Sequence, residues 1–368
     1  MKRSLPFVFL SLLTTFVAFT AVLFLSDLAH AEPGYSIADL GPGAGADWAF
    51  YGSGAVAIND RGQVVGGQGH AFLWSEGKSV DLGALPPEGP LDDTDSVANG
   101  INAHGVIVGT SGSFRPVFMS GLVVARGFIT EKNRLHQLTP HNSSFIPYAI
   151  NDKDEIVGLD AYRGFFYAQG KLVPLGTLST VPTGNRSTAW SINDQGQVVG
   201  WSIVDSRLKT TQSSLFTHAF LWKRGAHSGK MRDLGTLPGW VNSYAYGINR
   251  RGEVIGSVSD ESGNTDGVRS DSHAEGFLWR KGKMTALGTL PGRRNSEAFG
   301  INDSSQIVGR SDAHAFLWNS GKMLDLNSTL SSASGWILEE ARAINNHGQI
   351  IGNGTLNGQP HKFLLTPR

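Results

Sequence analysis

Seven polar side chains occupy one equivalent position in a repeated segment of this 368-residue chain, and they are the first candidates for chemistry. These residues are His70, Arg126, Arg163, His218, Glu275, His314 and His361. Imidazole, guanidinium and carboxylate groups can bind a ligand, and imidazole and carboxylate can bind a metal ion. The alternative is one structural hydrogen bond per repeat, because a residue that recurs in every repeat commonly belongs to the scaffold. The pattern favours the structural role, and the seven residues remain the candidate ligand-binding set.

Acidic residues form two further clusters. Asp92, Asp93 and Asp95 supply oxygen ligands of the kind that Ca²⁺ prefers. The spacing of a calcium-binding loop is absent, so we predict no metal site there. The second cluster is expected at the solvated tip of a hairpin, and it consists of Asp152, Asp154 and Glu155.

Tryptophans occur two residues after a phenylalanine in several repeats, at Trp74, Trp222, Trp279 and Trp318. Indole rings could serve as stacking platforms for sugars. A spacing of two residues instead places each Trp on the same face of a strand as its Phe, which favours packing between neighbouring sheets.

The chain contains none of the short motifs that mark common enzymes. Gly-x-Ser-x-Gly, His-Glu-x-x-His and phosphate-binding loops do not occur. The chain has 0 cysteines, which excludes disulfides, thiolate metal ligands and a cysteine nucleophile. We therefore predict no catalytic residue, no metal and no cofactor.

The elements that position these residues are short β-strands. In the segment from Ser296 to Leu326, two strands flank a turn at Asn302, and a third strand alternates Phe316 and Trp318 with smaller residues. A turn at Gly321 then leads into a fourth strand. Four strands cannot bury both faces of their own sheet, so such units stack against one another.

The turn after the first strand recurs along the chain. An Ile-Asn pair precedes it each time, at intervals of 42 to 56 residues, and its asparagines are Asn59, Asn102, Asn151, Asn193, Asn249, Asn302 and Asn345. The third residue after each Asn is expected to have a positive φ, which Gly adopts freely. These residues are Gly62, Gly105, Asp154, Gly196, Gly252, Ser305 and Gly348.

The strand count predicts a closed ring. First, second and third strands occur seven times, whereas only six fourth strands follow them. The segment 35–41 matches the fourth-strand pattern, and it can complete the last unit. We therefore predict an all-β chain whose residues 32–368 form one seven-bladed β-propeller of four-stranded blades, closed by strand 35–41. The alternatives are an open array of β-units or two sandwiches.

The order of strands also predicts where ligands bind. The first strand of each repeat is expected beside the axis, because small residues such as Ala98, Ala245 and Gly300 suit a crowded centre. Insertions fall between second and third strands and between blades, on one face of the ring. They are 86–95, 110–125, 179–187, 201–217, 257–272 and 327–339. Long loops on a rigid scaffold commonly carry binding, so this loop-rich face, with its channel mouth, is the predicted site.

The His-Ala-Phe-Leu-Trp segments at residues 70, 218 and 314 resemble the HAF repeat of bacterial extracellular proteins. The resemblance covers most of residues 55–368, and the Ile-Asn turn followed by a Val/Ile-rich strand supports it. Two repeats depart from it with Arg126 and Arg163, and a third with Glu275. The resemblance implies export and repetition, and it supplies no active-site residues.

The first residues resemble a secretion signal. Lys2 and Arg3 precede an apolar run to Leu25, and Ala29-His30-Ala31 has the form of a cleavage site. We predict that residues 1–31 are a signal peptide, with a retained membrane anchor as the alternative. The mature protein is then secreted, periplasmic or on the cell surface, and no other membrane contact is expected.

Two functions remain open from the sequence. The first is a non-enzymatic binding scaffold that contacts a protein or glycan through the loop-rich face. The second is a glycan or peptide hydrolase or lyase with its active site at the channel mouth. Nucleic acid is not an expected partner, because 31 basic and 31 acidic residues leave a net charge of +0. We expect a monomer.

Overall fold

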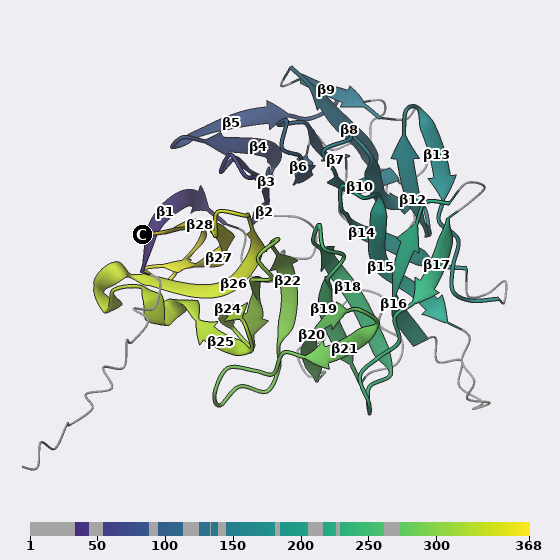
Figure 1. Ribbon diagram of the computed structural model, residues 1–368. Helices are drawn as coiled ribbons and strands as arrows, with labels where there is room; N and C mark the ends of the chain where they lie inside the picture. The colour runs from purple at the N-terminus through teal and green to yellow at the C-terminus, as the bar shows by residue number, and fades with distance from the viewer. Residues whose placement is uncertain are drawn as a thin grey trace, which may run out of the picture. The chain divides into compact units, whose positions relative to one another are not determined.

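The backbone forms seven four-stranded antiparallel sheets, which are the blades of a β-propeller (Figure 1). The computed structural model describes residues 34–43, 54–87, 95–112, 125–132, 134–138, 145–180, 185–204, 216–225, 229–260 and 273–368. All of them belong to one unit, Gly34–Arg368. The predicted signal peptide and much of the predicted loops, 88–94, 113–124, 181–184, 205–215 and 261–272 among them, lie outside the described residues.

Six blades are continuous in sequence, and their strands run in order from one sheet edge to the other. Blade 1 contains β2 (Gly54–Ile58), β3 (Val64–Gln68), β4 (His70–Ser75) and β5 (Lys78–Gly83), and blade 2 contains β6 (Ser96–Ile101), β7 (Ile107–Ser111), β8 (Arg126–Glu131) and β9 (Arg134–Gln137). Blade 3 contains β10 (Phe145–Ile150), β11 (Ile156–Asp160), β12 (Arg163–Ala168) and β13 (Lys171–Pro174), and blade 4 contains β14 (Ser187–Ile192), β15 (Gln197–Val204), β16 (Phe216–Lys223) and β17 (Lys230–Asp233). Blade 5 contains β18 (Asn242–Ile248), β19 (Val254–Ser259), β20 (Ala274–Arg280) and β21 (Lys283–Ala286), and blade 6 contains β22 (Glu297–Ile301), β23 (Ile307–Ser311), β24 (His314–Asn319) and β25 (Lys322–Asp325).

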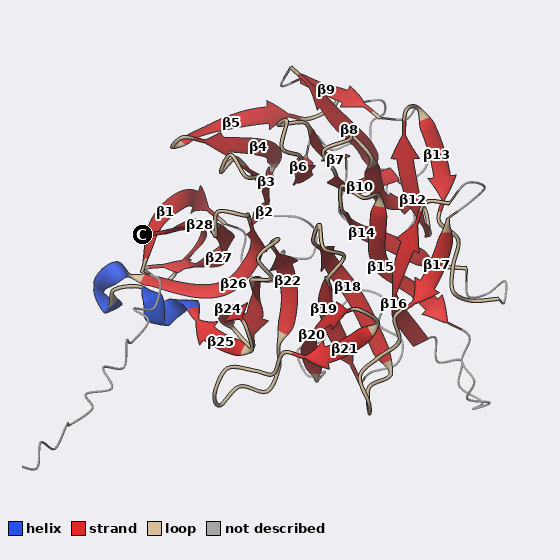
Figure 2. Ribbon diagram, viewed as in Figure 1, coloured by secondary structure: helices blue, strands red, loops and turns tan. Residues whose placement is uncertain are grey.

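Blade 7 joins the two ends of the described chain, as predicted. It combines β26 (Trp336–Ile344), β27 (Ile350–Leu356) and β28 (Gln359–Pro367) with the N-terminal strand β1 (Tyr35–Pro42), which lies beside β28 in Figure 1. Ile37 pairs with Leu365, and Asp39 pairs with Phe363. Strands joined by loops and turns make up most of Figure 2, and the helical elements in the described residues are two 3-10 turns, η3 (Leu326–Thr329) and η4 (Ser332–Ser334).

The turn prediction is confirmed at every repeat. The third residue after each Ile-Asn pair has a positive φ, between 57° and 85° in the set Gly62, Gly105, Asp154, Gly196, Gly252, Ser305 and Gly348. The glycine of the second strand is required for a different reason. At Gly256 a Cβ would lie 1.8 Å from the carbonyl oxygen of Tyr244 on the first strand, so no larger residue fits there.

The first strands lie at the inner edge of the blades and carry a β-bulge where register shifts, for example between Ala245 and Gly247. The extra residue of the bulge is aromatic in blades 3 to 6. These side chains form a row: ring centroids are 4.4 Å apart for Tyr148 and Trp190, 6.4 Å for Trp190 and Tyr246, and 5.8 Å for Tyr246 and Phe299. The row joins neighbouring inner strands.

Packing between blades uses the aromatic residues of the third strands, as the alternation predicted. Trp222 of blade 4 is 1% exposed, and its ring lies 5.5 Å from that of Phe166 in blade 3. Phe277 and Trp279 of blade 5 belong to a buried cluster with Val199 and Ala219 of blade 4. The Phe-x-Trp pairs therefore form the core between sheets rather than an exposed sugar platform.

The contact between blades 7 and 1 contains a buried cation. Lys362 on β28 is 3% exposed, and its Nζ atom lies 4.8 Å from the ring centroid of Phe72 on β4. Burial lowers the pKa of Lys362 to about 8, despite the opposing effect of the Asp39 carboxylate. The charged form is therefore less stable in the folded protein than in the unfolded chain.

This burial predicts an unusual alkaline stability profile. Between pH 8 and the ordinary lysine pKa of 10.5, the unfolded chain binds more protons than the folded protein, so the free energy of unfolding rises with pH. We expect a rise of roughly 1–2 kcal/mol from pH 7.5 to pH 9.5 in denaturant titrations. Lys362→Met should remove the rise and increase stability at pH 7, whereas Lys322→Met at an exposed site should do neither. A Lys362→Met variant with the wild-type pH profile would contradict this assignment.

Candidate functional site

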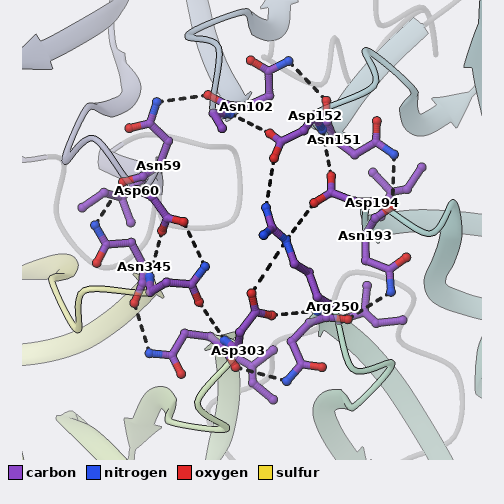
Figure 3. A pocket seen from close by; sticks show the side chains of 18 of the residues that line it. Asn59, Asp60, Asn102, Asn151, Asp152, Asn193, Asp194, Arg250, Asp303 and Asn345 are labelled. Atoms are coloured by element: carbon purple, nitrogen blue, oxygen red, sulfur yellow. Dashed lines mark hydrogen bonds and ion pairs between the residues drawn. The ribbon is translucent and has the colours of Figure 1, made fainter.

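The last residues of the first strands and the residues that follow them line a shallow pocket at one mouth of the channel (Figure 3). Its volume is about 200 Å³. Each blade contributes an Ile, the Asn after it and one further residue. The strands alternate in direction, so the turns between first and second strands point to one face, opposite the loop-rich face. The pocket therefore lies at the mouth that the sequence did not favour.

The seven asparagines form a closed ring of hydrogen bonds. In each blade the Asn Nδ2 donates to the backbone carbonyl oxygen of the equivalent Asn in the next blade, at 3.0–3.2 Å, and Asn345 donates to Asn59 across the contact between the last and first blades. The members, Asn59, Asn102, Asn151, Asn193, Asn249, Asn302 and Asn345, are 3–6% exposed. We call this set the Asn ring.

Each Asn also fixes its own turn. The Oδ1 atom of Asn302 accepts from the backbone N–H groups of Ser304 and Gln306, both at 3.0 Å, and its Nδ2 also donates to Gln306 Oε1 at 2.8 Å. Glu253 replaces Gln at the equivalent position of blade 5. Burial raises the pKa of Glu253, but hydrogen bonds from Ser305 and Asn249 outweigh burial, so the pKa lies below its ordinary value.

The residue after each Asn builds a second, incomplete ring. The side chain in one blade accepts from the backbone N–H of the preceding blade at 2.7–2.9 Å in five places. The seven residues are Asp60, Ala103, Asp152, Asp194, Arg250, Asp303 and Asn346. Ala103 and Arg250 have no acceptor atom, and they account for the two missing bonds.

Arg250 instead projects into the mouth on the side of blades 3, 4 and 6, as Figure 3 shows. Its guanidinium lies 2.8 Å from Asp194, 3.1 Å from Asp152 and 3.7 Å from Asp303. Burial lowers the pKa of Arg250, but the three carboxylates outweigh burial and raise the pKa above its ordinary value. Carboxylates from blades 3, 4 and 6 are thus held together by one cation from blade 5.

Most residues of this pocket were not predicted from the sequence as site residues. Asp152 and Glu155 do not lie free at a hairpin tip: Asp152 pairs with Arg250, and Glu155 accepts a 2.7 Å hydrogen bond from Asn151. The signal was visible in the residue that follows each Ile-Asn pair, which is Asp in four repeats. Its meaning depends on closure, because only a ring brings seven distant turns together.

The seven positions expected from the sequence lie at the starts of the third strands, and four of them are paired within their own blade. The histidine Nδ1 atoms lie 3.0 Å from Asp81, 2.9 Å from Asp233, 2.7 Å from Asp325 and 2.9 Å from Asp39, for His70, His218, His314 and His361. The paired Asp lies opposite the repeat phenylalanine on the fourth strand, as in Phe316 and Asp325.

The other blades lose both members of this pair. Arg126, Arg163 and Glu275 stand in place of His, and Gln137, Pro174 and Ala286 stand in place of Asp. Arg126 is 4% exposed and donates to the carbonyl oxygen of Pro86 at 2.9 Å, whereas Arg163 is exposed. The joint replacement supports the structural hydrogen bond, and ligand binding by these residues stays a prediction.

Three of the paired aspartates, Asp81, Asp233 and Asp325, have a pKa below the ordinary value. Burial raises the pKa of Asp325, but hydrogen bonds from Asn327 and His314 outweigh burial and lower the pKa. Asp233 shows the same balance with His218 and the N–H of Gly235. None of the pairs approaches the channel axis, because the third and fourth strands lie in the outer half of each blade.

A second cavity, of about 360 Å³, lies over blade 5 on the loop-rich face. Trp240, Asp260, His273, Glu275 and Arg294 line it together with smaller residues. Of the seven candidate ligand-binding residues taken from the sequence, Glu275 alone lines one of these two cavities. Within the described residues, no His, Asp and Glu cluster has the arrangement of a metal site.

Comparisons with known proteins give a family and distant resemblances in fold. One family model matches residues 71–364, and its description is "Protein of unknown function (DUF3466)". No curated protein sequence matches the chain. In the described part of the chain, no helix has the length and apolar character needed to cross a membrane.

Three of the solved structures that resemble this chain are distant. The extracellular domain of a protein assigned as a one component system from B. thetaiotaomicron has 10% identity and a TM-score of 0.48 over 89% of this chain and 39% of that chain. Pyrococcus horikoshii acylaminoacyl peptidase has 10% identity and a TM-score of 0.45 over 85% and 50%. A polysaccharide lyase has 8% identity and a TM-score of 0.47 over 85% and 89%. This chain spans half or less of the first two, and none of the three bears on activity.

The Asn ring predicts a stability loss on a one-atom change. Asn302→Asp keeps the oxygen that accepts from the turn but replaces the NH₂ that donates to Asn345 and Gln306. The carboxylate would face acceptors, so we expect roughly 2–4 kcal/mol less stability in denaturant titrations. Ser304→Ala in the same turn should change stability by less than about 0.5 kcal/mol. Equal stability of the two variants would contradict the role of the ring.

The three carboxylates around Arg250 predict that salt changes the stability of the wild-type protein and of an Arg250 variant in opposite directions. Arg250→Gln leaves Asp152, Asp194 and Asp303 unneutralised, and we expect a loss of about 1 kcal/mol because the arginine is half exposed. Salt screens repulsion, so NaCl should stabilise the variant relative to wild type. Arg61→Gln, on the exposed equivalent turn of blade 1, should behave as wild type. A variant that salt destabilises would show that these carboxylates do not repel one another.

Proposed function

For a chain that belongs to the DUF3466 family, we propose a non-enzymatic role: a rigid propeller that binds a partner through its loop-rich face. We further propose that it acts outside the cytoplasm, since residues 1–31 have the pattern of a secretion signal. The partner is a protein or a glycan.

One observation carries this proposal: in the described residues most of the repeated polar groups that could take part in acid–base chemistry are already bonded to one another. Four histidines are bonded to aspartates, the Asn ring uses its amides between blades, and three of the mouth carboxylates surround Arg250. A general acid or base needs a proton that it can exchange with a substrate. The His–Asp pairs recur in four blades and lie on the outer strands, away from the channel mouth, so they serve the scaffold.

The loop-rich face differs from this pattern. Its connections vary among blades in length and residue type, and its cavity over blade 5 contains charged side chains that are not part of the repeated pairs. Binding residues commonly lie on variable loops that a rigid scaffold positions. The closed mouth thus supplies rigidity, and the opposite face supplies recognition.

A hydrolase or lyase is the second candidate, and one observation favours it. Asp260, His273 and Glu275 line the same cavity, and His273 Nδ1 lies 3.4 Å from Asp260. Two carboxylates beside a substrate pocket can act as acid and base on a glycosidic bond. Release of reducing ends from a bound glycan would favour this alternative.

The absence of cysteine permits a direct test of the working face. Lys283→Cys places a single thiol beside the turns of the Asn-ring face, and Pro291→Cys places one on the loop-rich face; both residues are exposed. Each full-length variant is coupled through its thiol to a bulky maleimide polymer. The coupled proteins are then screened against arrays of glycans and secreted proteins. We expect the polymer at residue 291 to abolish binding and the polymer at residue 283 to leave it unchanged.

The uncoupled variants serve as controls for folding and intrinsic affinity. Loss of binding with the polymer at residue 283 alone would place recognition at the Asn-ring mouth and overturn the proposed face. Absence of any partner among glycans and secreted proteins would overturn the binding role itself.

A further inference from the structure

We infer that the cavity over blade 5 binds a pyranose unit of a glycan, with Trp240, Glu275 and Arg294 as its recognition residues. This inference rests on the proposed function and adds a ligand class and a location to it. The cavity lies between the connection that enters blade 5 and the connection that leaves it, beside the start of β20.

Trp240 occupies a turn that does not itself require tryptophan. The connection from blade 4 to blade 5 reads LGTLPGWVNS at 234–243, and the connection from blade 5 to blade 6 reads LGTLPGRRNS at 287–296. Trp240 N–H donates to Leu237 O at 3.1 Å, and Arg293 N–H donates to Leu290 O at 3.0 Å. The two turns share the same hydrogen bonds, so the indole is an addition to the scaffold.

The same turn holds the indole in place for a ligand. Thr236 Oγ1 donates to the carbonyl oxygen of Trp240 at 3.0 Å, which completes the bonding of its backbone. One part of the side chain packs against the buried cluster of blade 5, and the residue remains partly exposed at the cavity. An aromatic ring that is fixed before binding loses little conformational entropy when a ligand stacks on it.

Glu275 is available because its blade lacks the usual partner. Four blades pair a His at this position with an Asp on the fourth strand, whereas Glu275 lies near Ala286, which has no polar side chain. The side chain of Glu275 is half-buried, and in the described residues it makes neither a hydrogen bond nor an ion pair. A carboxylate in this state can accept two hydroxyl hydrogen bonds from one ligand.

Arg294 is the third departure from the repeat, since Val241 occupies its place in the preceding connection. Its backbone N–H donates to Asp312 at 3.2 Å, which fixes the main chain, while the side chain is exposed at the cavity. Three residues that break the repeat in different elements therefore meet in one cavity. Scaffold roles explain residues that repeat; these three are explained by a shared ligand.

The combination fits a pyranose better than other small ligands. The hydrophobic C–H face of a sugar ring stacks on an indole, while its hydroxyl groups need both acceptors and donors, which Glu275 and Arg294 supply. A volume of about 360 Å³ lies at the small end of ligand pockets and suits one or two sugar units. Asp260 and His273, whose Nδ1 lies 3.4 Å from Asp260, also line the cavity and add polar groups for neighbouring hydroxyl groups.

The test uses the full-length chain and a panel of soluble oligosaccharides with neutral, uronate and amino-sugar pyranose units. Binding is measured by calorimetry and by saturation-transfer NMR, which identifies the sugar protons that contact the protein. Trp240→Leu preserves packing but removes the flat indole face, and we expect the dissociation constant to rise at least about tenfold. Glu275→Gln preserves shape, and we expect a rise of about fivefold.

Matched controls separate the site from the fold. Arg293→Leu changes the equivalent position of the other turn, and Arg163→Gln changes the exposed equivalent of Glu275 in blade 3; both should bind within about twofold of wild type. All four variants should unfold at the wild-type temperature within a few degrees. Undiminished glycan binding in Trp240→Leu and Glu275→Gln would overturn the assignment, as would no binding to any member of the panel.

The outcome is distinguishable from that of the proposed function. If the chain binds a secreted protein through the loop-rich face but no oligosaccharide, the binding role stands and the pyranose site falls. If an oligosaccharide binds and the polymer at residue 283 blocks it, the proposed face falls together with this site.

Discussion

The Asn ring is the constraint on which the rest of the structure depends. A propeller must hold its first and last blades together. Backbone hydrogen bonds join some neighbouring blades at single points, as between Ser96 N–H and Gly69 O at 2.8 Å, whereas the Asn ring continues through all seven blades. Here each inner strand ends in an amide that uses both donor hydrogens and both acceptor sites, within its own turn and toward the next blade. A buried amide with any partner removed is costly, so the network favours the closed, sevenfold arrangement over partial ones.

Closure has two further components that act at different radii. At the outer edge, β1 completes blade 7, and the contact between His361 and Asp39 adds a side-chain bond to the strand pairing. At the mouth, Arg250 replaces the bonds that the incomplete second ring lacks near blade 5. One mouth is thus occupied by the protein's own groups. Because these contacts lie at one mouth and at the outer edge, residues of the opposite face can vary without disrupting the Asn ring.

Repetition inside one chain separates scaffold from recognition without any comparison to relatives. A His at the start of a third strand occurs with an Asp on the fourth strand, and the two disappear together in blades 2, 3 and 5. That joint change identifies a structural pair. Trp240 and Arg294 instead differ from their equivalents in the other matching connection, and Glu275 is left without an aspartate partner because Ala286 stands in that place. Residues that differ from their equivalents in this way are the candidates for ligand binding, because the scaffold does not account for them.

The sequence by itself determined the blade count, the strand order, the closure by residues 35–41 and the positive φ at each turn, because these depend on local pattern and on counting. It also indicated that the repeated His position is structural. The Asn ring, the contacts of Arg250 with three carboxylates and the cavity over blade 5 were decided only by the tertiary structure. Each joins residues from different blades, such as Asn345 with Asn59, and their distances depend on how the ring curves. The glycine after the Val/Ile pair shows the same limit. The pattern is plain in the sequence, but its cause in blades 2 to 7 is a first-strand carbonyl oxygen 1.8–2.1 Å from the missing Cβ, which exists only once the bulged strand is in place.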